Sequence, residues 1–325
     1  MRAVRFHSLG GPEVMVVDEV PEPAPKPGQV ALRVRAVGVN WADGHFRKGE
    51  YFIKPNFPQI AGMEASGEVI ALGEGVTGVA VGDPVMALGG NAYAEVMVAR
   101  AEHVYPMPNG LSFEDAASLP VQGLTAMHVL RLLGRMAKGE KVLVHAAAGG
   151  VGTFAVQLAK QMGASFVVGT VGSAEKIGLV RELGADLVVD ATKDDFVQSV
   201  KGASKRGVDL VLEMVGGAEQ YKRNLACLAP FGRMIVYGAA SGQLRGTVEP
   251  VGLMTKNLAV SGYYLTPLID QVDLCAPQIA ELARWVVERS VRVVRAKTYR
   301  FADVVEAHRA MEARATVGKI VLVPG

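Results

Sequence analysis

The sequence predicts an α/β protein that combines a doubly wound parallel sheet with a second, β-rich domain. Three observations support this. Short apolar runs separated by Gly and Pro fill residues 1–120, strands alternate with helices from about residue 124, and 325 residues exceed one ordinary core. We expect a Rossmann-type dinucleotide-binding domain at 123–265 and a β-rich domain built from 1–122 and 266–325.

In the first 120 residues, the placement of Gly and Pro between apolar runs is typical of strands joined by long loops. Apolar or alternating runs occupy 2–6, 29–37, 65–71 and 92–98. The segment VPEPAPKPGQV at 20–30 holds four prolines and must run extended between two strands. Residues 73–88 place a glycine-rich turn before a further strand.

From residue 141 the chain alternates strand and helix. The expected strands are 141–145, 165–169, 187–190, 208–213 and 233–237, and the expected helices are 151–162, 174–183 and 220–228. Gly163 and Gly184 end the first two helices. This spacing is that of βαβ units, which form a parallel sheet.

The tail after residue 264 contains a helix at 277–288, a strand at 293–299, a helix at 301–313 and a strand at 319–323. About sixty residues are few for a separate core, because a domain of that size buries a smaller fraction of its surface than a larger domain does. We therefore expect it to return to the N-terminal domain, so that the chain crosses the cleft between the domains twice.

Composition excludes several classes of protein. The chain carries 34 basic and 32 acidic residues without a basic run, so nucleic acid is not an expected partner. Its only cysteines, Cys227 and Cys275, are too far apart for a disulfide framework or a CxxC metal site, which fits a reducing compartment. No signal-peptide pattern or long apolar run is present, so we expect no membrane contact and a cytoplasmic location.

Residues 144–153, VHAAAGGVGT, match a dinucleotide fingerprint in which Ala147 replaces the first glycine. That glycine serves the tight turn, so alanine is compatible if it needs no positive φ. The motif lies between an apolar strand and a helix, where a pyrophosphate binds the helix N-terminus, although glycine-rich turns also occur in ordinary helix caps. The expected cofactor contacts are Ala148, Gly149, Gly150, Val151 and Gly152.

The end of the second strand selects the dinucleotide. An NAD site presents an acidic residue about 20 residues on, but GTVGSAEK at 169–176 has no acid before Glu175. Ser173 and Lys176, with Thr170 and Gly172 beside them, offer a hydroxyl and a cation to a 2′-phosphate. We therefore expect NADPH. Ser173 also suits the N-cap of the following helix.

Seven segments carry a resemblance to a known family. They are FHSLGGPEVM (6–15), VGVNWADGHFRKG (37–49), AGMEASGEVIALGEGVTGVAVGDPV (61–85), PVQGLTAMHVL (120–130), HAAAGGVG (145–152), GTVGSAEK (169–176) and RATVGKIVLVP (314–324). Over nearly the whole chain they resemble the zinc-independent quinone oxidoreductase branch of the medium-chain dehydrogenase/reductase superfamily. AAxGGVG is typical of that branch, so the resemblance makes Ala147 a family trait. It also implies that the β-rich domain is a GroES-like catalytic domain.

Zinc is not expected. Zinc-dependent relatives place a Cys and a His where this chain has Asn40 and Met63. Without thiolates or clustered histidines a tetrahedral zinc site cannot form, and alcohol oxidation is disfavoured because it needs a Lewis acid. What remains is hydride transfer to an acceptor that is already electrophilic.

Two residues are candidates for contact with the acceptor. Asn40 is expected at the cleft floor, where its amide could bond the cofactor ribose or a quinone oxygen, or alternatively fix a loop. Tyr51 could supply a proton or a hydrogen bond, or serve as a lid or core residue. Asp43 and Arg47 lie four residues apart and could pair to shape the loop.

The resemblance implies further cofactor contacts. It places Gly123 and Thr125 near the nicotinamide, Tyr237 and Gly238 at a strand end beside the ring, and Arg314 near the phosphates, with a surface salt bridge as the alternative for Arg314. One departure is Ala191, where NADPH-binding relatives often carry a tyrosine. Residues 263–265 form either an aromatic wall or part of an edge strand, and a homodimer could pair the strand near 258–263.

The function expected from these features is an NADPH-dependent quinone oxidoreductase that transfers hydride to a quinone without a metal. Two alternatives stay open. One is an NADPH-dependent reductase of enone or enoyl C=C bonds, for which no basic CoA entrance is evident. The other is a weakly active NADPH-binding scaffold, since a fold does not determine a function.

Overall fold

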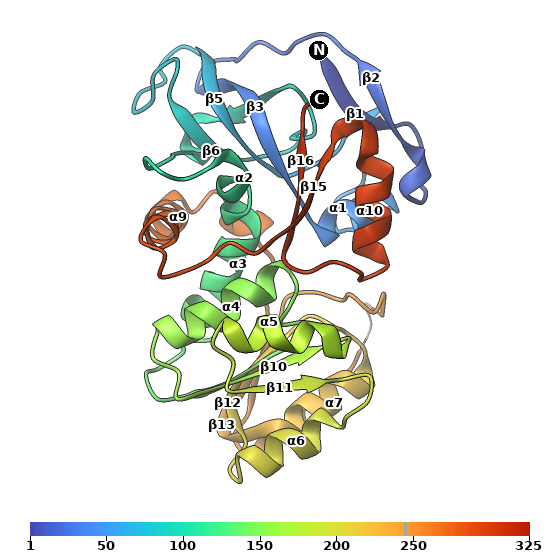
Figure 1. Ribbon diagram of the computed structural model, residues 1–325, viewed down its shortest axis with the longest axis vertical. Helices are drawn as coiled ribbons and strands as arrows, with labels where there is room; N and C mark the ends of the chain where they lie inside the picture. The colour runs from blue at the N-terminus through green and yellow to red at the C-terminus, as the bar shows by residue number, and fades with distance from the viewer. Residues whose placement is uncertain (244–245) are drawn as a thin grey trace. The chain divides into compact units, whose positions relative to one another are not determined.

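The computed structural model describes residues 1–243 and 246–325. Contacts between residues divide the chain into two units. The first unit joins Met1–Leu124 to Thr266–Gly325, and the second is Thr125–Leu265. Each unit is built around its own sheets (Figure 1).

The second unit contains a six-stranded sheet in which every neighbouring pair is parallel. Its spatial order is β11, β10, β9, β12, β13 and β14. The bounds are Lys141–Val144 (β9), Phe166–Val171 (β10), Leu187–Asp190 (β11), Val208–Glu213 (β12), Leu228–Val236 (β13) and Ala259–Gly262 (β14). The order reverses direction beside β9, which confirms the doubly wound sheet, and β9 and β12 are mostly apolar because helices cover both faces.

The helices of this unit are Leu124–Met127 (α3, at the boundary), Gly150–Gln161 (α4), Ile177–Glu182 (α5), Phe196–Ala203 (α6), Ala218–Cys227 (α7) and Pro250–Met254 (α8). Figure 1 shows α4 and α5 on one face of the sheet and α6 and α7 on the other. The helix expected at 174–183 divides into a 3-10 turn at Ala174–Lys176 followed by α5. Neither α6 nor α8 was expected from the sequence.

The first unit contains a seven-stranded, mainly antiparallel sheet and a three-stranded sheet. The larger has the order β15, β16, β3, β5, β6, β8, with β7 on β3, and the smaller has the order β2, β1, β4. The bounds are Arg2–Phe6 (β1), Met15–Glu19 (β2), Gln29–Val39 (β3), Gln59–Ile60 (β4), Glu64–Leu72 (β5), Pro84–Leu88 (β6), Val96–Arg100 (β7), Val104–Pro106 (β8), Arg295–Arg300 (β15) and Lys319–Val323 (β16).

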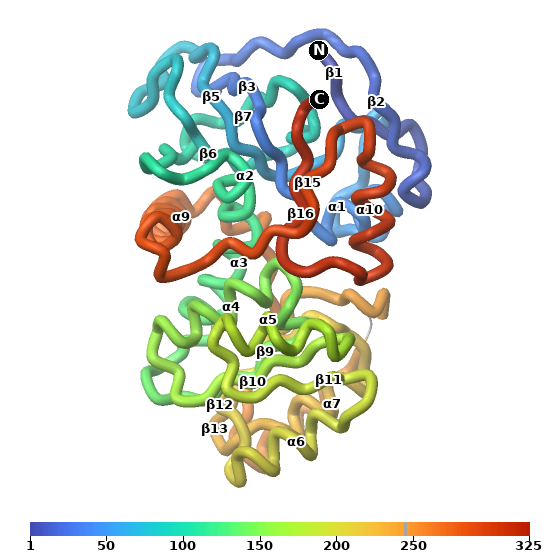
Figure 2. Tube along the Cα trace, viewed as in Figure 1, coloured from blue at the N-terminus to red at the C-terminus, as the bar shows by residue number. Residues whose placement is uncertain are grey.

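The C-terminal strand lies within this sheet. β16 pairs antiparallel with β3, with Ile320 opposite Val39, and Figure 2 shows the red end of the chain beside the blue strand. This pairing joins the two ends of the chain around one core, which includes Val4, Leu32, Tyr93 and Leu322.

The helices of the first unit are Trp41–Arg47 (α1), Phe113–Ala116 (α2), Val272–Val287 (α9) and Val304–Glu312 (α10). α9 begins five residues before its expected start at 277 and so contains Pro277. The lost backbone hydrogen bond is offset because Cys275, Ile279 and Leu282 bury one face of the helix. None of the helices in the described ranges combines the length and the apolar composition required to cross a bilayer.

Candidate functional site

The turn between β9 and α4 has the conformation that a dinucleotide fingerprint requires. Its left-handed residue is Ala146, at φ 47°, and not Ala147. Ala147 is buried, and its N–H donates to the carbonyl of Thr170 at 2.9 Å. The alanine at the first fingerprint position therefore needs no positive φ, and the turn forms without a glycine there.

Two glycines bring α4 close to this turn. A Cβ on Gly152 would lie 2.7 Å from the Cα of Ala147 and would overlap the carbonyl of Ala146. Gly149 is the N-cap and contributes no side-chain cap. Because the first N–H groups of a helix have no intrahelical acceptor, the amides of Gly150, Val151 and Gly152 form the type of site that binds a pyrophosphate. Ala148 is buried just before them.

The end of β10 presents neutral and basic side chains. Thr170 is buried, and Gly172 and half-buried Ser173 follow it. Ser173 occupies the N-cap position in an extended conformation, but its hydroxyl makes no capping hydrogen bond. The expected side-chain cap is therefore absent from this turn. Lys176 lies half-buried in the same turn, and burial lowers the pKa of its ammonium.

A buried polar cluster, which sequence reasoning missed, lies under these loops. His145 Nδ1 lies 2.9 Å from the Thr170 hydroxyl, and its Nε2 lies 2.7 Å from Asn224 Oδ1. Asn224 donates to Glu213 Oε2, while Glu213 Oε1 accepts from the amide of Gly216 at 2.7 Å. The cluster joins the carboxyl ends of β9, β10 and β12, where ligands bind in open parallel sheets. Burial lowers the pKa of His145 and favours the neutral ring.

Two predicted cofactor residues follow β13. The N–H of Tyr237 donates to the Glu213 carbonyl at 2.9 Å, and its buried hydroxyl finds no hydrogen-bond partner among the described residues. A Cβ on Gly238 would lie 3.2 Å from Met214 Cβ, so the glycine packs closely against the residue that comes after β12. Thr125 is buried in the same unit.

Asn40 precedes α1 and is held on every side. Its backbone N–H donates to Asp43 Oδ2 at 2.8 Å, which is half of a capping box. Its side-chain Nδ2 donates to Glu64 Oε1 at 2.8 Å and to the Gly38 carbonyl at 3.3 Å, and its Oδ1 accepts from Lys319 Nζ at 2.8 Å. Both amide protons are thus engaged within the protein, as the loop-fixing alternative requires. The remaining capacity of the side chain is as an acceptor.

Asp43 and Arg47 take different partners. Asp43 Oδ2 accepts from the Tyr93 hydroxyl at 3.0 Å, and burial raises the pKa of its carboxyl to about 6. Arg47 is fully buried and donates to His308 Nδ1 at 2.8 Å and to Glu312 at 2.5 Å. Burial, with Arg47 nearby, lowers the pKa of His308 to about 3, so the ring is neutral at physiological pH. The expected Asp43–Arg47 pair is replaced by these separate contacts.

The other predicted residues of the first unit lie at the surface or against α9. Tyr51 is half-buried in the loop between α1 and β4, its ring centroid 5.6 Å from that of Phe52, which is 78% exposed. Gly123 packs tightly against Leu282 of α9, because a Cβ there would overlap Leu282 Cδ2. Arg314 is exposed after α10 at φ 56°. Asn40, Tyr51, Gly123 and Arg314 thus belong to the first unit, and the other predicted residues belong to the second.

Tyr263 continues the edge strand of the second unit. Its N–H donates to the Val236 carbonyl at 2.8 Å, which extends the β13–β14 pairing by one residue. Its hydroxyl lies 3.0 Å from His128 Nδ1. These contacts favour the edge-strand interpretation for Tyr263, while residues 264 and 265 lie outside the strand.

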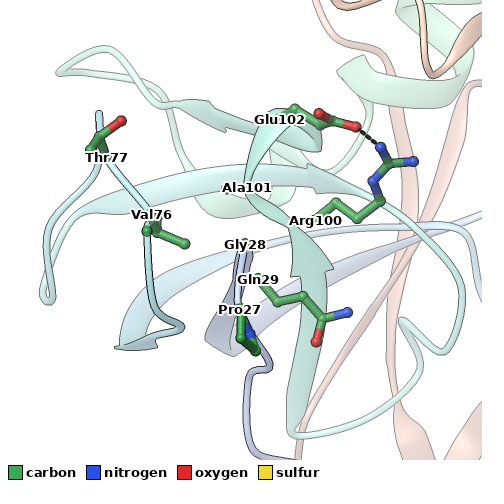
Figure 3. Close-up of a pocket in the computed structure, with 9 residues that line it drawn as sticks. Pro27, Gly28, Gln29, Val76, Thr77, Arg100, Ala101 and Glu102 are labelled. Carbon is green, nitrogen blue, oxygen red and sulfur yellow. Dashed lines mark ion pairs between the residues drawn. The ribbon is translucent and has the colours of Figure 1, made fainter.

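Carboxylates and a histidine also converge in the first unit. Ligand atoms of Glu102, His103 and Asp270 lie within 4.8 Å of one another. Arg100 pairs with Asp270 at 2.9 Å and with Glu102, so a cation already compensates both carboxylates. Figure 3 shows the Arg100–Glu102 ion pair at the rim of a surface hollow that Gly28 and Val76 also line. The arrangement is that of an ion-pair network.

Comparison with known proteins gives matches over both units. Two family models match: "alcohol dehydrogenase GroES-like domain" over residues 26–109, and "zinc-binding dehydrogenase" over residues 183–322. The first match lies in the β-rich unit and confirms the GroES-like part of the predicted fold class.

Relatives of similar length cover the whole chain. The synaptic vesicle membrane protein VAT-1 homolog of Rattus norvegicus is 36% identical over 344 residues, covering 100% of this chain and 84% of that protein. A quinone oxidoreductase of Pseudomonas aeruginosa is 33% identical over 326 residues and 99% of each chain. The solved structure of Escherichia coli quinone oxidoreductase complexed with NADPH has a TM-score of 0.94, 32% identity and full coverage of both chains.

Proposed function

Because the chain belongs to the quinone oxidoreductase branch of the medium-chain dehydrogenase/reductase superfamily, we propose that it reduces quinones with NADPH and without zinc. The choice of NADPH as the cofactor rests on the side chains at the end of β10. There Ser173 keeps its hydroxyl out of the helix cap, and Lys176 supplies a cation in place of the acid of an NAD site. Both groups suit a 2′-phosphate.

The residues that would hold NADPH divide by the part of the molecule they meet. Amides of the α4 N-terminus, with Ala148 and Gly149 before them, would bind the pyrophosphate. Thr170, Gly172, Ser173 and Lys176 would surround the adenosine phosphate, and Arg314 would add charge at the phosphates. Gly123, Thr125, Tyr237 and Gly238 would lie by the nicotinamide, which supplies the hydride.

At the acceptor, the proposal separates the roles of two residues. The Tyr51 phenol donates a hydrogen bond, or a proton, to a quinone oxygen as charge develops there. Asn40 presents Oδ1 as an acceptor to a ribose hydroxyl of the cofactor, because both of its N–H groups are engaged. One hydride from NADPH and one proton, replaced from solvent, convert the quinone to the quinol. Asn40 and Met63 stand where zinc-dependent relatives have ligands, so no Lewis acid is invoked.

The proposal extends to assembly and location. β14 forms one edge of the parallel sheet, and exposed edges are commonly covered by a partner strand. We propose a homodimer that pairs this edge, in the cytoplasm, with a small electrophilic acceptor as its partner and neither nucleic acid nor membrane.

Charge reversal tests the assignment of the 2′-phosphate site. Lys176→Glu is expected to weaken NADPH binding about 10- to 100-fold, because a charge-assisted contact becomes repulsive. NADH has no 2′-phosphate, so its affinity should change little. Fluorescence titration of both cofactors gives the two dissociation constants. Lys205→Glu makes the same charge change in an exposed turn at the amino end of β12 and serves as the control. Equal weakening of both cofactors by Lys176→Glu would contradict the assignment.

The activity itself is tested by following oxidation of NADPH and NADH in parallel, with a chelator present. The acceptors are ortho-quinones, para-quinones, small enones and an enoyl-CoA. We expect the fastest turnover with NADPH and a quinone, unaffected by the chelator. Turnover restricted to enones or enoyl-CoA would assign the protein to the double-bond reductases. Tight NADPH binding without turnover of any acceptor would leave a cofactor-binding scaffold.

A further inference from the structure

A buried ion pair holds the side chain of Asn40. Lys319 begins β16 and Glu64 begins β5, and both side chains are almost completely excluded from solvent. Lys319 Nζ donates to Glu64 Oε1 at 2.5 Å and to Asn40 Oδ1 at 2.8 Å. Glu64 Oε1 also accepts from Asn40 Nδ2 at 2.8 Å. The three side chains form a closed triangle of hydrogen bonds, which defines which way the amide of Asn40 faces.

The second oxygen of the same carboxylate reaches another part of the unit. Glu64 Oε2 accepts from the backbone N–H of Val121 at 2.7 Å. Val121 lies in the wide helical turn Leu119–Gly123, which contains the proposed nicotinamide contact Gly123. One buried carboxylate therefore holds Asn40 with one oxygen and the turn at 121–123 with the other.

The backbone is shaped to admit this pair. A Cβ on Gly38 would lie 2.6 Å from Lys319 Cε and would overlap Glu64 Oε1 and the carbonyl of Ala117. Gly38 has an ordinary strand conformation, since its φ is not positive. Glycine is therefore needed here for the close approach of the two charged side chains, and not for backbone freedom.

Stability alone is a poor explanation for such a pair. Removing two charges from water costs as much as their attraction returns, so apolar replacements of buried pairs are often neutral or stabilising. Burial indeed lowers the pKa of Lys319, and the charge of Glu64 opposes that shift. Elsewhere in the same sheet, the surface pair of Arg35 and Glu68, at 2.9 Å, joins β3 to β5 without this cost. What distinguishes the buried pair is its contact with Asn40 and Val121.

We propose that Glu64 and Lys319 are positioning residues for the reductase reaction, which present Asn40 as a hydrogen-bond acceptor and hold the turn at 121–123 in place. This inference rests on the proposed function, because the role of Asn40 belongs to that function. Neither charged side chain touches the substrate. Their effect passes through the orientation of the Asn40 amide. Glu64 and the Gly38 carbonyl accept from its two N–H groups, and Lys319 donates to its oxygen.

The charge-neutral double variant Glu64→Gln/Lys319→Met tests the proposal. It removes both buried charges, so neither is left unpaired as in the single variants. The double variant should melt close to the wild type, while kcat for a quinone falls about tenfold, the loss expected for one misplaced hydrogen bond. NADPH affinity measured by fluorescence should change less than kcat. The control, Arg35→Met/Glu68→Gln, removes an exposed pair between β3 and β5 of the same sheet and should retain wild-type kcat.

The outcomes separate this inference from the proposed function. A double variant that melts like the wild type and keeps kcat within about twofold would overturn the positioning role. If the wild-type protein reduces no quinone, the proposed function fails first. Hydrogen exchange of the Asn40 side-chain amide in the wild-type protein then tests separately whether this amide is held in place. Its signal is assigned by its loss in Asn40→Asp. Slow exchange of both protons supports the fixed orientation of the Asn40 amide. Exchange as fast as that of the exposed Asn56 would refute it, even if every variant unfolded.

Discussion

Gly152→Ala is expected to weaken NADPH binding about 100-fold, because the added Cβ has only backbone to displace. It would lie 2.7 Å from the Cα of Ala147 and overlap the carbonyl of Ala146. Relief of this overlap requires α4 to move away from the turn. Such a movement takes the first amides of the helix away from the position where they would meet the pyrophosphate. Fluorescence titration with NADPH, together with a melting curve, measures both consequences.

A second glycine of the same unit provides the matched control. Gly178 lies in α5, and a Cβ there would have no atom within 4 Å. Gly178→Ala should therefore bind NADPH normally and melt at the same or a slightly higher temperature, since alanine favours a helix. If Gly152→Ala binds NADPH as tightly as Gly178→Ala, α4 does not bind the cofactor through its N-terminus in the way proposed.

Arg47→Met should lower the free energy of unfolding by about 2–4 kcal/mol, through the loss of donors to buried acceptors. The Arg47 guanidinium is fully buried, and it donates to His308 Nδ1 at 2.8 Å and to the Gly10 carbonyl at 3.1 Å. Methionine fills similar space but leaves both acceptors unpaired. Glu312 keeps Lys48 as a partner at 3.0 Å, so its charge adds little to the loss. Denaturant unfolding of both proteins measures the difference.

A surface arginine gives the comparison. Arg284 pairs with Glu288 on the exposed face of α9 at 2.9 Å, with both side chains at least half exposed. Arg284→Met should cost no more than about 0.5 kcal/mol, because such pairs contribute little in water. Equal destabilisation by the two substitutions would mean that the buried contacts of Arg47 do not hold α1 to α10.

The elements predicted most accurately were the strands of the parallel sheet. The expected strands at 187–190 and 208–213 coincide with β11 and β12, since each is mostly apolar and ends in an acidic residue. α6 was missed although Asp195 caps it by accepting from the Val197 N–H at 2.9 Å. The helix is short, and only two of its residues are buried, so its periodic signal is weak.

The candidate site likewise contains parts that local sequence predicted and parts that it did not. The position of the turn at 145–152 and the close approach of Gly152 were predictable because they lie within one local motif, whereas the positive φ of Ala146 came only from the structure. The N-cap position of Asn40 was not predicted, although Asp43 three residues later is the local signal for it. The cluster of His145, Asn224 and Glu213 was not predictable, because its members come from three separate segments of the chain.

By itself, the sequence determined the strand and helix periods, the position of the fingerprint turn between a strand and a helix, the absence of an acid at the end of β10, and the family. All of these depend on residues that are near neighbours in the chain. Only the tertiary structure decided that Lys319 and Glu64, which are 255 residues apart, would meet at Asn40, where Glu64 accepts from its N–H and Lys319 donates to its oxygen. The physical reason is that a side chain forms hydrogen bonds with the groups that folding places around it. Those partners are distant in the chain, so no local sequence pattern predicts them.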